Sequence, residues 1–364
     1  MTVQGHGWDD NTGYPAFRNI IINGGMSIAQ RNTSVASITT GNYYTADRWN
    51  VGTDGIFGTW TQSVENDAPT GSGLRKSLKM LCTVVRSSLS ANDALVFEQR
   101  VEGQNIQHLA KGTSSTKSIT ISFWVKSNVT GTYIVRLRDH ANSRHISAAY
   151  TINASATWQK ETITFTGDTA GIINNDNTTG LAVQFWLLAG SNYSGGTLAT
   201  SWAAINDANC AVGQVNLAGT VSNYWQVTGV QLEAGPVATP FEFEPFETTL
   251  RKCQRYFISY GGGGVYEPVA LGFARGATAA DVTTFFPVEM RIPPTASVSA
   301  AGDWQLSNGV TSWVCTTISN YGVQSGKKIS VFGAFVASGL TNGAPLRLEA
   351  KNRTTSRLNF NAEL

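Results

Sequence analysis

The chain has 364 residues, enough for two domains with full hydrophobic cores. Charged residues make up only 14% of the sequence, against about 25% in ordinary soluble domains. The net charge of +2 argues against a nucleic-acid or membrane-surface partner, which would need a basic patch. Neutral polar residues and 37 glycines are typical of an all-β protein with many turns.

The start of the chain lacks the apolar run of a secretion signal, and no run approaches the ~18 apolar residues of a membrane span. We therefore expect neither ordinary secretion nor membrane insertion. Four cysteines lie far apart, without the paired spacing of zinc ligands: Cys82, Cys210, Cys253 and Cys315. This dispersed pattern favours folding in a reducing cytosol.

Residues 1–18 show no periodicity and predict an extended N-terminal arm. From residue 19 onward, short runs alternate apolar and polar residues and are separated by Gly, Asn, Asp and Ser. Such alternation predicts strands with one buried face. One run points four apolar residues to the same side: Ile119, Ile121, Phe123 and Val125. The pattern predicts a jelly-roll β-sandwich over residues 19–243.

A long neutral segment, residues 190–223, interrupts this pattern and carries several aromatic residues. Long loops in ordinary domains are usually functional or flexible. We expect this one to contribute to function.

A proline-rich connector and a short helix follow, over residues 244–260. Proline fixes φ and extends the residue before it. Leu250, Cys253 and Phe257 then fall at i, i+3 and i+7, the apolar face of a helix predicted over residues 247–257. Residues 261–364 predict a second, smaller β-sandwich.

No phosphate-binding, zinc-protease or serine-hydrolase motif occurs, and the carboxylates are scattered. His140 and His145 could form a metal pair across a hairpin, but ordinary turn residues are the favoured interpretation. Glu242, Glu244 and Glu247 could bind a divalent cation, but a solvated connector is favoured. We predict a protein that is not an enzyme, with no cofactor and no metal.

Ten tryptophans and eleven tyrosines are many for this length. Trp60, Tyr193 and Trp202 fall in predicted loops, where exposed rings could stack on sugars while Asn192 binds hydroxyl groups. These four residues are our glycan-binding candidates. The alternative is that the rings pack under the long loop or against another subunit.

Several segments resemble tailed-bacteriophage tail fibre or receptor-binding proteins with a carbohydrate-binding-module-like jelly roll. They read NIIINGGMSIAQRNTS, YYTADRW, SITISFWVKS, TWQKETITFTG, GVQLEAGPVATPFEFEPFETTLRKCQRYF and the terminal FNAEL. The similarity runs from about Asn19 to Phe257, with a looser match at Pro287–Thr295.

The resemblance implies a homotrimeric virion protein that assembles in the host cytoplasm with other tail proteins and binds a host surface polysaccharide. Leu250, Cys253 and Phe257 are then candidates for the oligomer interface. Related modules can bind calcium through a Glu near an Asn-Gly strand. Here the region reads NGGMSIAQ without that acid, so a structural calcium is unsupported.

Three functions follow from these observations. The first is binding of a host glycan, which predicts solvent-facing aromatic groups in a groove and binding to host polysaccharide. The second is a purely structural virion component, which predicts loop aromatics buried between subunits. The third, less favoured, is a polysaccharide depolymerase, which predicts a carboxylate pair in a cleft.

Overall fold

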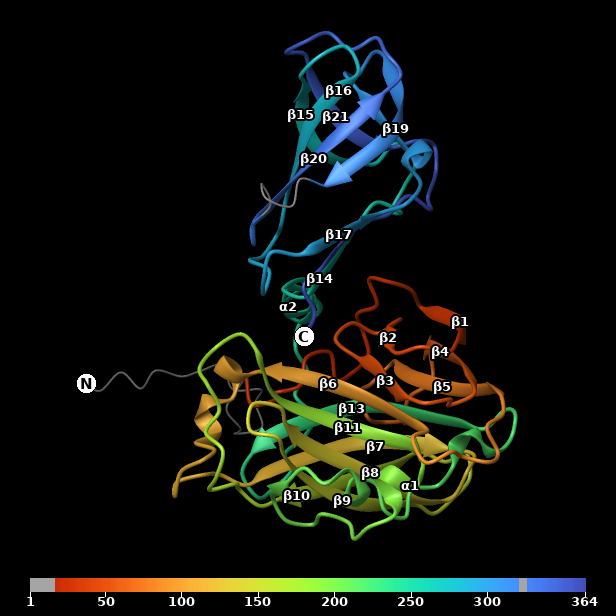
Figure 1. The fold of residues 1–364 in the computed structure, drawn as a ribbon, viewed down its shortest axis with the longest axis vertical. Coiled ribbons are helices and arrows are strands. Elements are labelled where there is room, and N and C mark those ends of the chain that lie inside the picture. Colours follow the sequence, from red (N-terminus) through yellow and green to blue (C-terminus); the bar gives the residue numbers. More distant parts are fainter. Residues whose placement is uncertain (1–16, 321–325) are drawn as a thin grey trace, which may run out of the picture. The chain divides into compact units, whose positions relative to one another are not determined.

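The computed structural model of the chain describes residues 17–320 and 326–364 (Figure 1). It is 43% strand and 8% helix, which confirms the predicted all-β class. The chain divides into two units, residues 1–249 with Leu364 (unit 1) and residues 250–363 (unit 2). The predicted arm covers residues 1–18, and residues 1–16 of it lie outside the described residues.

Unit 1 consists of two antiparallel sheets that face each other across one core (Figure 1). The six-stranded sheet has the order β1 (Ser34–Ile38), β4 (Thr59–Glu65), β5 (Ser77–Val84), β13 (Tyr224–Ala234), β7 (Ile119–Ser127), β10 (Gln159–Phe165). The seven-stranded sheet has the order β12 (Ala203–Ala204), β9 (Arg144–Ile152), β8 (Gly131–Asp139), β11 (Thr179–Ala189), β6 (Ala94–Glu102), β3 (Asn50–Asp54), β2 (Asn42–Tyr43).

The helices are short and lie between the strands. Among residues 17–320 and 326–364, two are α-helices: α1 (Ser191–Ser194) and α2 (Phe246–Gln254). Five are single 3₁₀ turns: η1 (Gly103–Asn105), η2 (Gln107–Leu109), η3 (Asp207–Asn209), η4 (Leu217–Gly219) and η5 (Ala301–Asp303). No helix among the described residues is long and apolar enough to cross a membrane.

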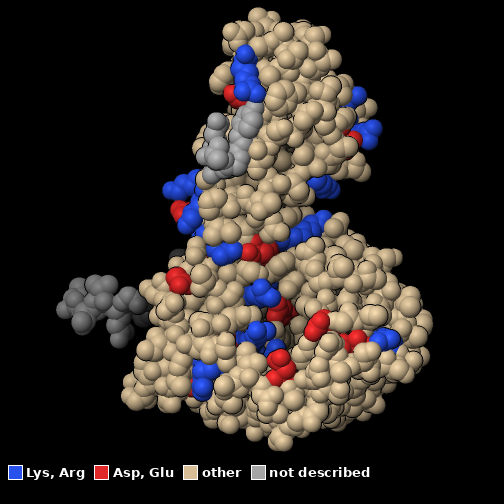
Figure 2. Space-filling view, viewed as in Figure 1, with Lys and Arg blue, Asp and Glu red and all other residues tan. Residues whose placement is uncertain are grey.

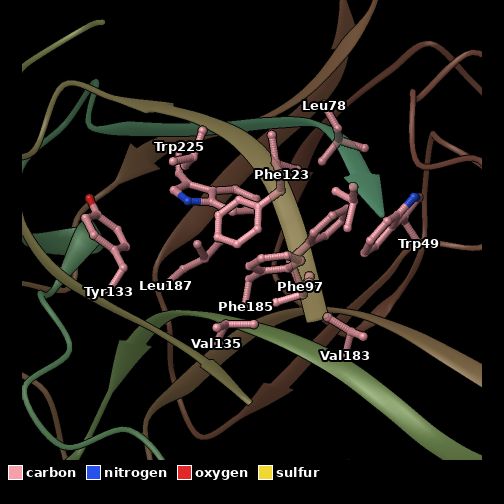
Figure 3. Packing of buried hydrophobic residues seen from close by; sticks show 14 of the residues in the cluster. Trp49, Leu78, Phe97, Phe123, Tyr133, Val135, Val183, Phe185, Leu187 and Trp225 are labelled. Atoms are coloured by element: carbon pink, nitrogen blue, oxygen red, sulfur yellow. The ribbon is translucent and has the colours of Figure 1, made fainter. Parts of the chain in front are cut away.

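The core of unit 1 is built around aromatic rings from both sheets (Figure 3). The rings of Trp49 and Phe97 stack with centroids 4.8 Å apart, and Phe123 meets Phe185 edge-to-face at 5.0 Å. Aromatic pairs of this kind add about 0.5–1.5 kcal/mol beyond their buried area. The four alternating apolar residues predicted on β7 are all buried in this core, which confirms that strand.

The Asn-Gly turn near the start of unit 1 is fixed by close backbone contact. A Cβ atom on Gly24 would lie 2.0 Å from the carbonyl oxygen of Val230, on β13. The amide N–H of Val230 donates in turn to the carbonyl of Gly24. Only glycine permits this approach, which attaches the turn to the middle of the six-stranded sheet.

Trp60 does not lie in a loop, so its assignment as a glycan contact is wrong. It lies in β4, it is 0% exposed, and its indole N–H donates to the carbonyl of Phe57 at 2.8 Å. The sequence around it has many polar residues because only alternate positions of β4 face the core.

Unit 2 differs from the predicted second sandwich. Six strands form a closed barrel in the order β15 (Pro268–Ala274), β16 (Ala279–Phe285), β20 (Ile329–Val336), β19 (Ser312–Asn320), β18 (Trp304–Ser307), β21 (Pro345–Ala350). Gly272 allows β15 to approach β16, since a Cβ there would lie 1.8 Å from the carbonyl oxygen of Asp281. A three-stranded sheet has the order β14 (Phe257–Tyr260), β22 (Leu358–Asn361), β17 (Thr295–Val298).

Helix α2 runs from Phe246 to Gln254, so it begins directly after Pro245 and is shorter than predicted. Phe257 lies in β14 rather than on the helix, because β14 pairs with β22 from that residue onward. Phe257 and Cys253 are buried within the chain, which removes both as candidates for an oligomer interface. Leu250 is half-buried and stays a candidate for the oligomer interface. All four cysteines are buried, and none forms a disulfide bond.

We predict that Trp60→Ala destabilises unit 1 by about 3–5 kcal/mol, because it leaves a large cavity in the core. The free energy of unfolding in urea measures the loss. The control is Val84→Ala on the neighbouring β5, where the side chain is 54% exposed and a change within about 0.5 kcal/mol is expected. Equal stability of the two variants would contradict the burial of Trp60.

Candidate functional site

The seven-stranded sheet has one face in the core and one face turned away from it, which we call the outer face. On β11, Val183 and Phe185 point into the core, and Gln184 and Trp186 therefore point outward. Figure 2 shows Lys, Arg, Asp and Glu side chains gathered in a hollow of unit 1 over β6, β11 and β8, amid a mostly uncharged surface.

A row of polar side chains, the polar row, crosses four strands of the outer face: Asn50 (β3), Glu98 (β6), Gln184 (β11) and Arg136 (β8). Each is the direct cross-strand partner of the next. Arg136 Nε donates to Gln184 Oε1 at 2.7 Å, and Gln184 Nε2 donates to Glu98 Oε2 at 2.5 Å. Asn50 Nδ2 donates to Glu98 Oε1 at 3.2 Å. The strand register therefore produces a continuous hydrogen-bonded chain.

Glu98 is the buried anion of the polar row. Burial raises the pKa of this carboxyl, but the charge of Arg100 and the hydrogen bonds from Gln184 and Asn50 outweigh burial and lower the pKa. Arg100 Nε lies 2.9 Å from Glu98 Oε1. Glu98 is therefore held ionised.

A second row, the cationic row, lies beside the first and consists of Arg100 (β6), Ala182 (β11), Arg138 (β8) and His145 (β9). The Arg100 side chain is 31% exposed and pairs with Glu98. Arg138 is half-buried and forms no hydrogen bond or ion pair with the described part of the chain, and its Nε is fully buried. The sheet thus presents a guanidinium without a counter-charge.

Three further donors or acceptors on the outer face have no partner among the described residues. They are the Nε2 atoms of His140 and His145 and the indole N–H of Trp186, all shielded from solvent. Buried polar groups are nearly always hydrogen-bonded in native structures. Two of the four residues, Arg138 and His140, are partly exposed, whereas His145 and Trp186 are fully buried, so Arg138 and His140 are the candidates for contact with a ligand.

Both histidines are neutral at pH 7. Burial, followed by the charge of Arg138, lowers the pKa of His140 to about 4. Burial, followed by the charge of Arg136, lowers the pKa of His145 to about 4. Across the described ranges, no group of three or more His, Cys, Asp or Glu side chains could hold a metal ion.

Residues 190–211, the covering segment, lie over the apolar end of the outer face. Cys210, Ala211, Leu198 and Tyr193 of this segment pack in one cluster with Trp186 and neighbouring apolar residues of the sheet. The ring of Tyr193 lies 5.4 Å from that of Trp186, and the Arg136 guanidinium lies 5.1 Å from the Trp186 ring. The covering segment leaves Arg100, Arg138 and His140 partly exposed.

The structure does not bring the predicted glycan contacts together. Tyr193 lies in α1, where its hydroxyl donates to Asp54, and the exposed Asn192 donates to the side chain of Asn92. Trp202 packs against the main core instead, with its indole N–H donating to the carbonyl of Thr166 at 2.8 Å. Tyr193 and Trp202 thus belong to different clusters.

The ring of Trp202 also lies 5.0 Å from the ammonium of Lys111, a lysine with a side chain only 3% exposed. Lys111 forms ion pairs with Asp139 and with Asp168, the latter at 2.9 Å, and Arg144 also pairs with Asp168. This buried cluster ties a loop to the end of the β8–β9 hairpin. Its charges are mutually satisfied, so we assign it to stability.

A separate cavity of about 210 Å³ lies in unit 1, beside residues 241–249. One of its walls is Glu242, which accepts a hydrogen bond from the amide of Asn19 at 2.8 Å. Glu242, which the sequence left open as a cation ligand, therefore anchors the start of the first unit.

The site residues missed by the sequence are Arg100, Arg138, Glu98 and Gln184, whereas His140 was considered only as a possible metal ligand. A signal for them exists, because charged residues recur at alternate positions of otherwise apolar strands: Glu98 and Arg100 on β6, Arg136 and Arg138 on β8. Such a pattern marks a sheet with a polar second face.

No protein-family model matches this chain, and no curated protein matches it. Among solved structures, the enzymatically active domain of tailspike protein 4 from bacteriophage CBA120 aligns with 12% identity and a TM-score of 0.32, covering 59% of this chain and 21% of that one. The chain thus spans about a fifth of that tailspike.

Two other solved structures are similar at the same level. The family 11 carbohydrate-binding module from Clostridium thermocellum, in complex with a mixed-linked tetrasaccharide, aligns with 11% identity and a TM-score of 0.30, covering 56% of this chain and 99% of that one. A cyclase from Fischerella sp. TAU aligns with 14% identity and a TM-score of 0.30, covering 61% and 99%. These similarities are too low to assign a function.

The unfolding free energy should fall as the pH is lowered from about 6.5 to about 4. Both histidines have pKa values of about 4 in the folded chain and about 6.5 when unfolded, so the unfolded state binds more protons in this window. Urea unfolding at several pH values measures the slope. His140→Gln combined with His145→Gln should flatten it, and an unchanged slope would contradict the assigned pKa values.

Proposed function

We propose that this protein binds a surface glycan through the outer face of its seven-stranded sheet. The observation that carries this proposal is the group of unsatisfied polar atoms on that face, with Arg138 and His140 partly accessible to solvent. Sugars present many hydroxyl groups, which bind to fixed side-chain donors and acceptors. The polar row beneath holds those side chains in a defined register.

The number and the ionisation state of the carboxylates in the two rows favour binding over catalysis. The polar and cationic rows contain one carboxylate, Glu98, whereas glycoside hydrolysis uses two. Glu98 is ionised and engaged by Arg100, Gln184 and Asn50, so it does not offer a proton to a leaving group. The depolymerase alternative therefore has no support on this face.

The sequence resemblance to phage tail fibre proteins supports a place for the chain on a virion, assembled in the host cytoplasm, with a bacterial surface polysaccharide as ligand. The purely structural alternative predicts that the outer face is covered by another subunit. Glycan binding predicts that it stays open to solvent. The two proposals thus differ in the accessibility of Arg100 and Arg138.

The central test is His140→Ala, which replaces a neutral, partly exposed side chain of the site with no side-chain partner at Nε2 among the described residues. It removes about one hydrogen-bonding group, so we expect about tenfold weaker adsorption of the full chain to host cells. The control is Lys160→Ala with Thr162→Ala, on exposed positions of β10 in the other sheet. Equal adsorption by both variants, or by cells stripped of polysaccharide, would contradict glycan binding at this face.

The same resemblance supports a homotrimer, with Leu250 of α2 in the interface. Because an aspartate cannot be buried unpaired between subunits, Leu250→Asp should give monomers in light scattering. Arg251→Ala, exposed on the same helix, should leave the assembly unchanged. A trimer that survives Leu250→Asp would remove this residue from the interface.

A further inference from the structure

We propose that the glycan bound at the outer face is acidic, and that Arg138 and Arg100 bind a carboxylate of a uronic acid. This inference rests on the proposed function and specifies its ligand class. It depends on the charges, spacing and missing partners of the cationic row.

The charges of the two rows do not balance. Three arginines, Arg100, Arg136 and Arg138, accompany one carboxylate, that of Glu98. Arg136 is engaged by Gln184 and lies against Cys210, and Arg100 pairs with Glu98. Arg138 alone has no partner in the described part of the chain. Asp207 of the nearby η3 turn adds a negative charge that acts on Arg136 and His145, so the positive charge left without a partner is that of Arg138.

The spacing of the row suits a single anionic group. Arg100 and Arg138 are both cross-strand partners of Ala182. Because neighbouring strands lie about 4.8 Å apart, the Cβ atoms of the two arginines are about 10 Å apart, and long side chains can converge over the small residue between them. Ala182 is fully buried, and its short side chain does not hold the two arginines apart.

The chemistry of the donors favours a carboxylate. A guanidinium presents a planar fork of N–H groups that matches the two oxygens of a carboxylate. The Arg138 side chain is half-exposed and makes no hydrogen bond within the described chain, and because its Nε is buried, its terminal Nη groups are the donors that a ligand can reach. His140 is neutral and adds a hydrogen-bonding group at the rim without adding charge. A sugar that carries a carboxylate beside its hydroxyl groups would satisfy both kinds of group.

Arg138 is also well placed for a clean test. Since Arg138 makes no hydrogen bond or ion pair within the described chain, Arg138→Gln breaks neither, and its unfolding free energy should stay within about 0.5 kcal/mol of that of the natural protein. Arg100→Gln is less informative, because it removes a partner of the buried Glu98. The charge-matched control is Lys160→Gln on the other sheet.

The experiment measures binding of the full chain to an immobilised panel of bacterial surface polysaccharides. Every uronic-acid-containing member is also present in a carboxyl-reduced form, with the acid converted to a primary alcohol. We expect binding to at least one acidic member and a loss of about tenfold or more on reduction of its carboxylates. Arg138→Gln should lose the same factor on the native polysaccharide and almost nothing on the reduced one. Lys160→Gln should bind like the natural protein.

The other outcomes are distinguishable. If the protein binds neutral or carboxyl-reduced members as tightly as acidic ones, or if Arg138→Gln binds normally, the acidic ligand is wrong and glycan binding stands. If no member of the panel is bound, the proposed function itself is overturned together with this inference.

Discussion

The outer face of the seven-stranded sheet depends on one buried charge, the carboxylate of Glu98. Its oxygens accept hydrogen bonds from three neighbouring side chains, and the chain of bonds continues through Gln184 to Arg136. Breaking a buried charge network by removing one partner typically costs about 3–5 kcal/mol. A slip of β11 by one residue would also move Gln184 into the core and expose apolar side chains. The network therefore fixes the register and the positions of Arg100 and Arg136.

The covering segment divides this face into two regions with different roles. At the apolar end, residues 190–211 cover Trp186 and neighbouring apolar side chains and shield them from solvent. At the cationic end no described segment neutralises Arg138. The covered end stabilises unit 1 because its apolar side chains are removed from water. The open end leaves polar side chains accessible to a ligand. The aromatic residues therefore stabilise the fold, and polar groups are left to bind the ligand.

Features with a local cause could be predicted from the sequence. Alternation on β7 and proline before α2 act over a few residues, and both were found where expected, with the helix ending three residues early. The burial of Trp60 was missed because a tryptophan flanked by polar residues can occur in a loop or in a strand with one face exposed to solvent. The local sequence does not distinguish the two. The closed barrel of unit 2 was also missed, since closure depends on the pairing of β15 with β21, more than 70 residues apart.

The candidate site could not be assembled from the sequence for the same reason. Arg100 and Arg138 lie on either side of Ala182 only because β6 and β8 both pair with β11. No short-range sequence pattern encodes that register. The most direct measurement of the account is an NMR titration of the full chain with an acidic oligosaccharide, followed at the guanidinium Nη–H resonance of Arg138. The account predicts that this resonance shifts and becomes protected from exchange with water, while signals of β10 stay in place. An unmoved Arg138 resonance, with shifts confined to β10 or to unit 2, would contradict it.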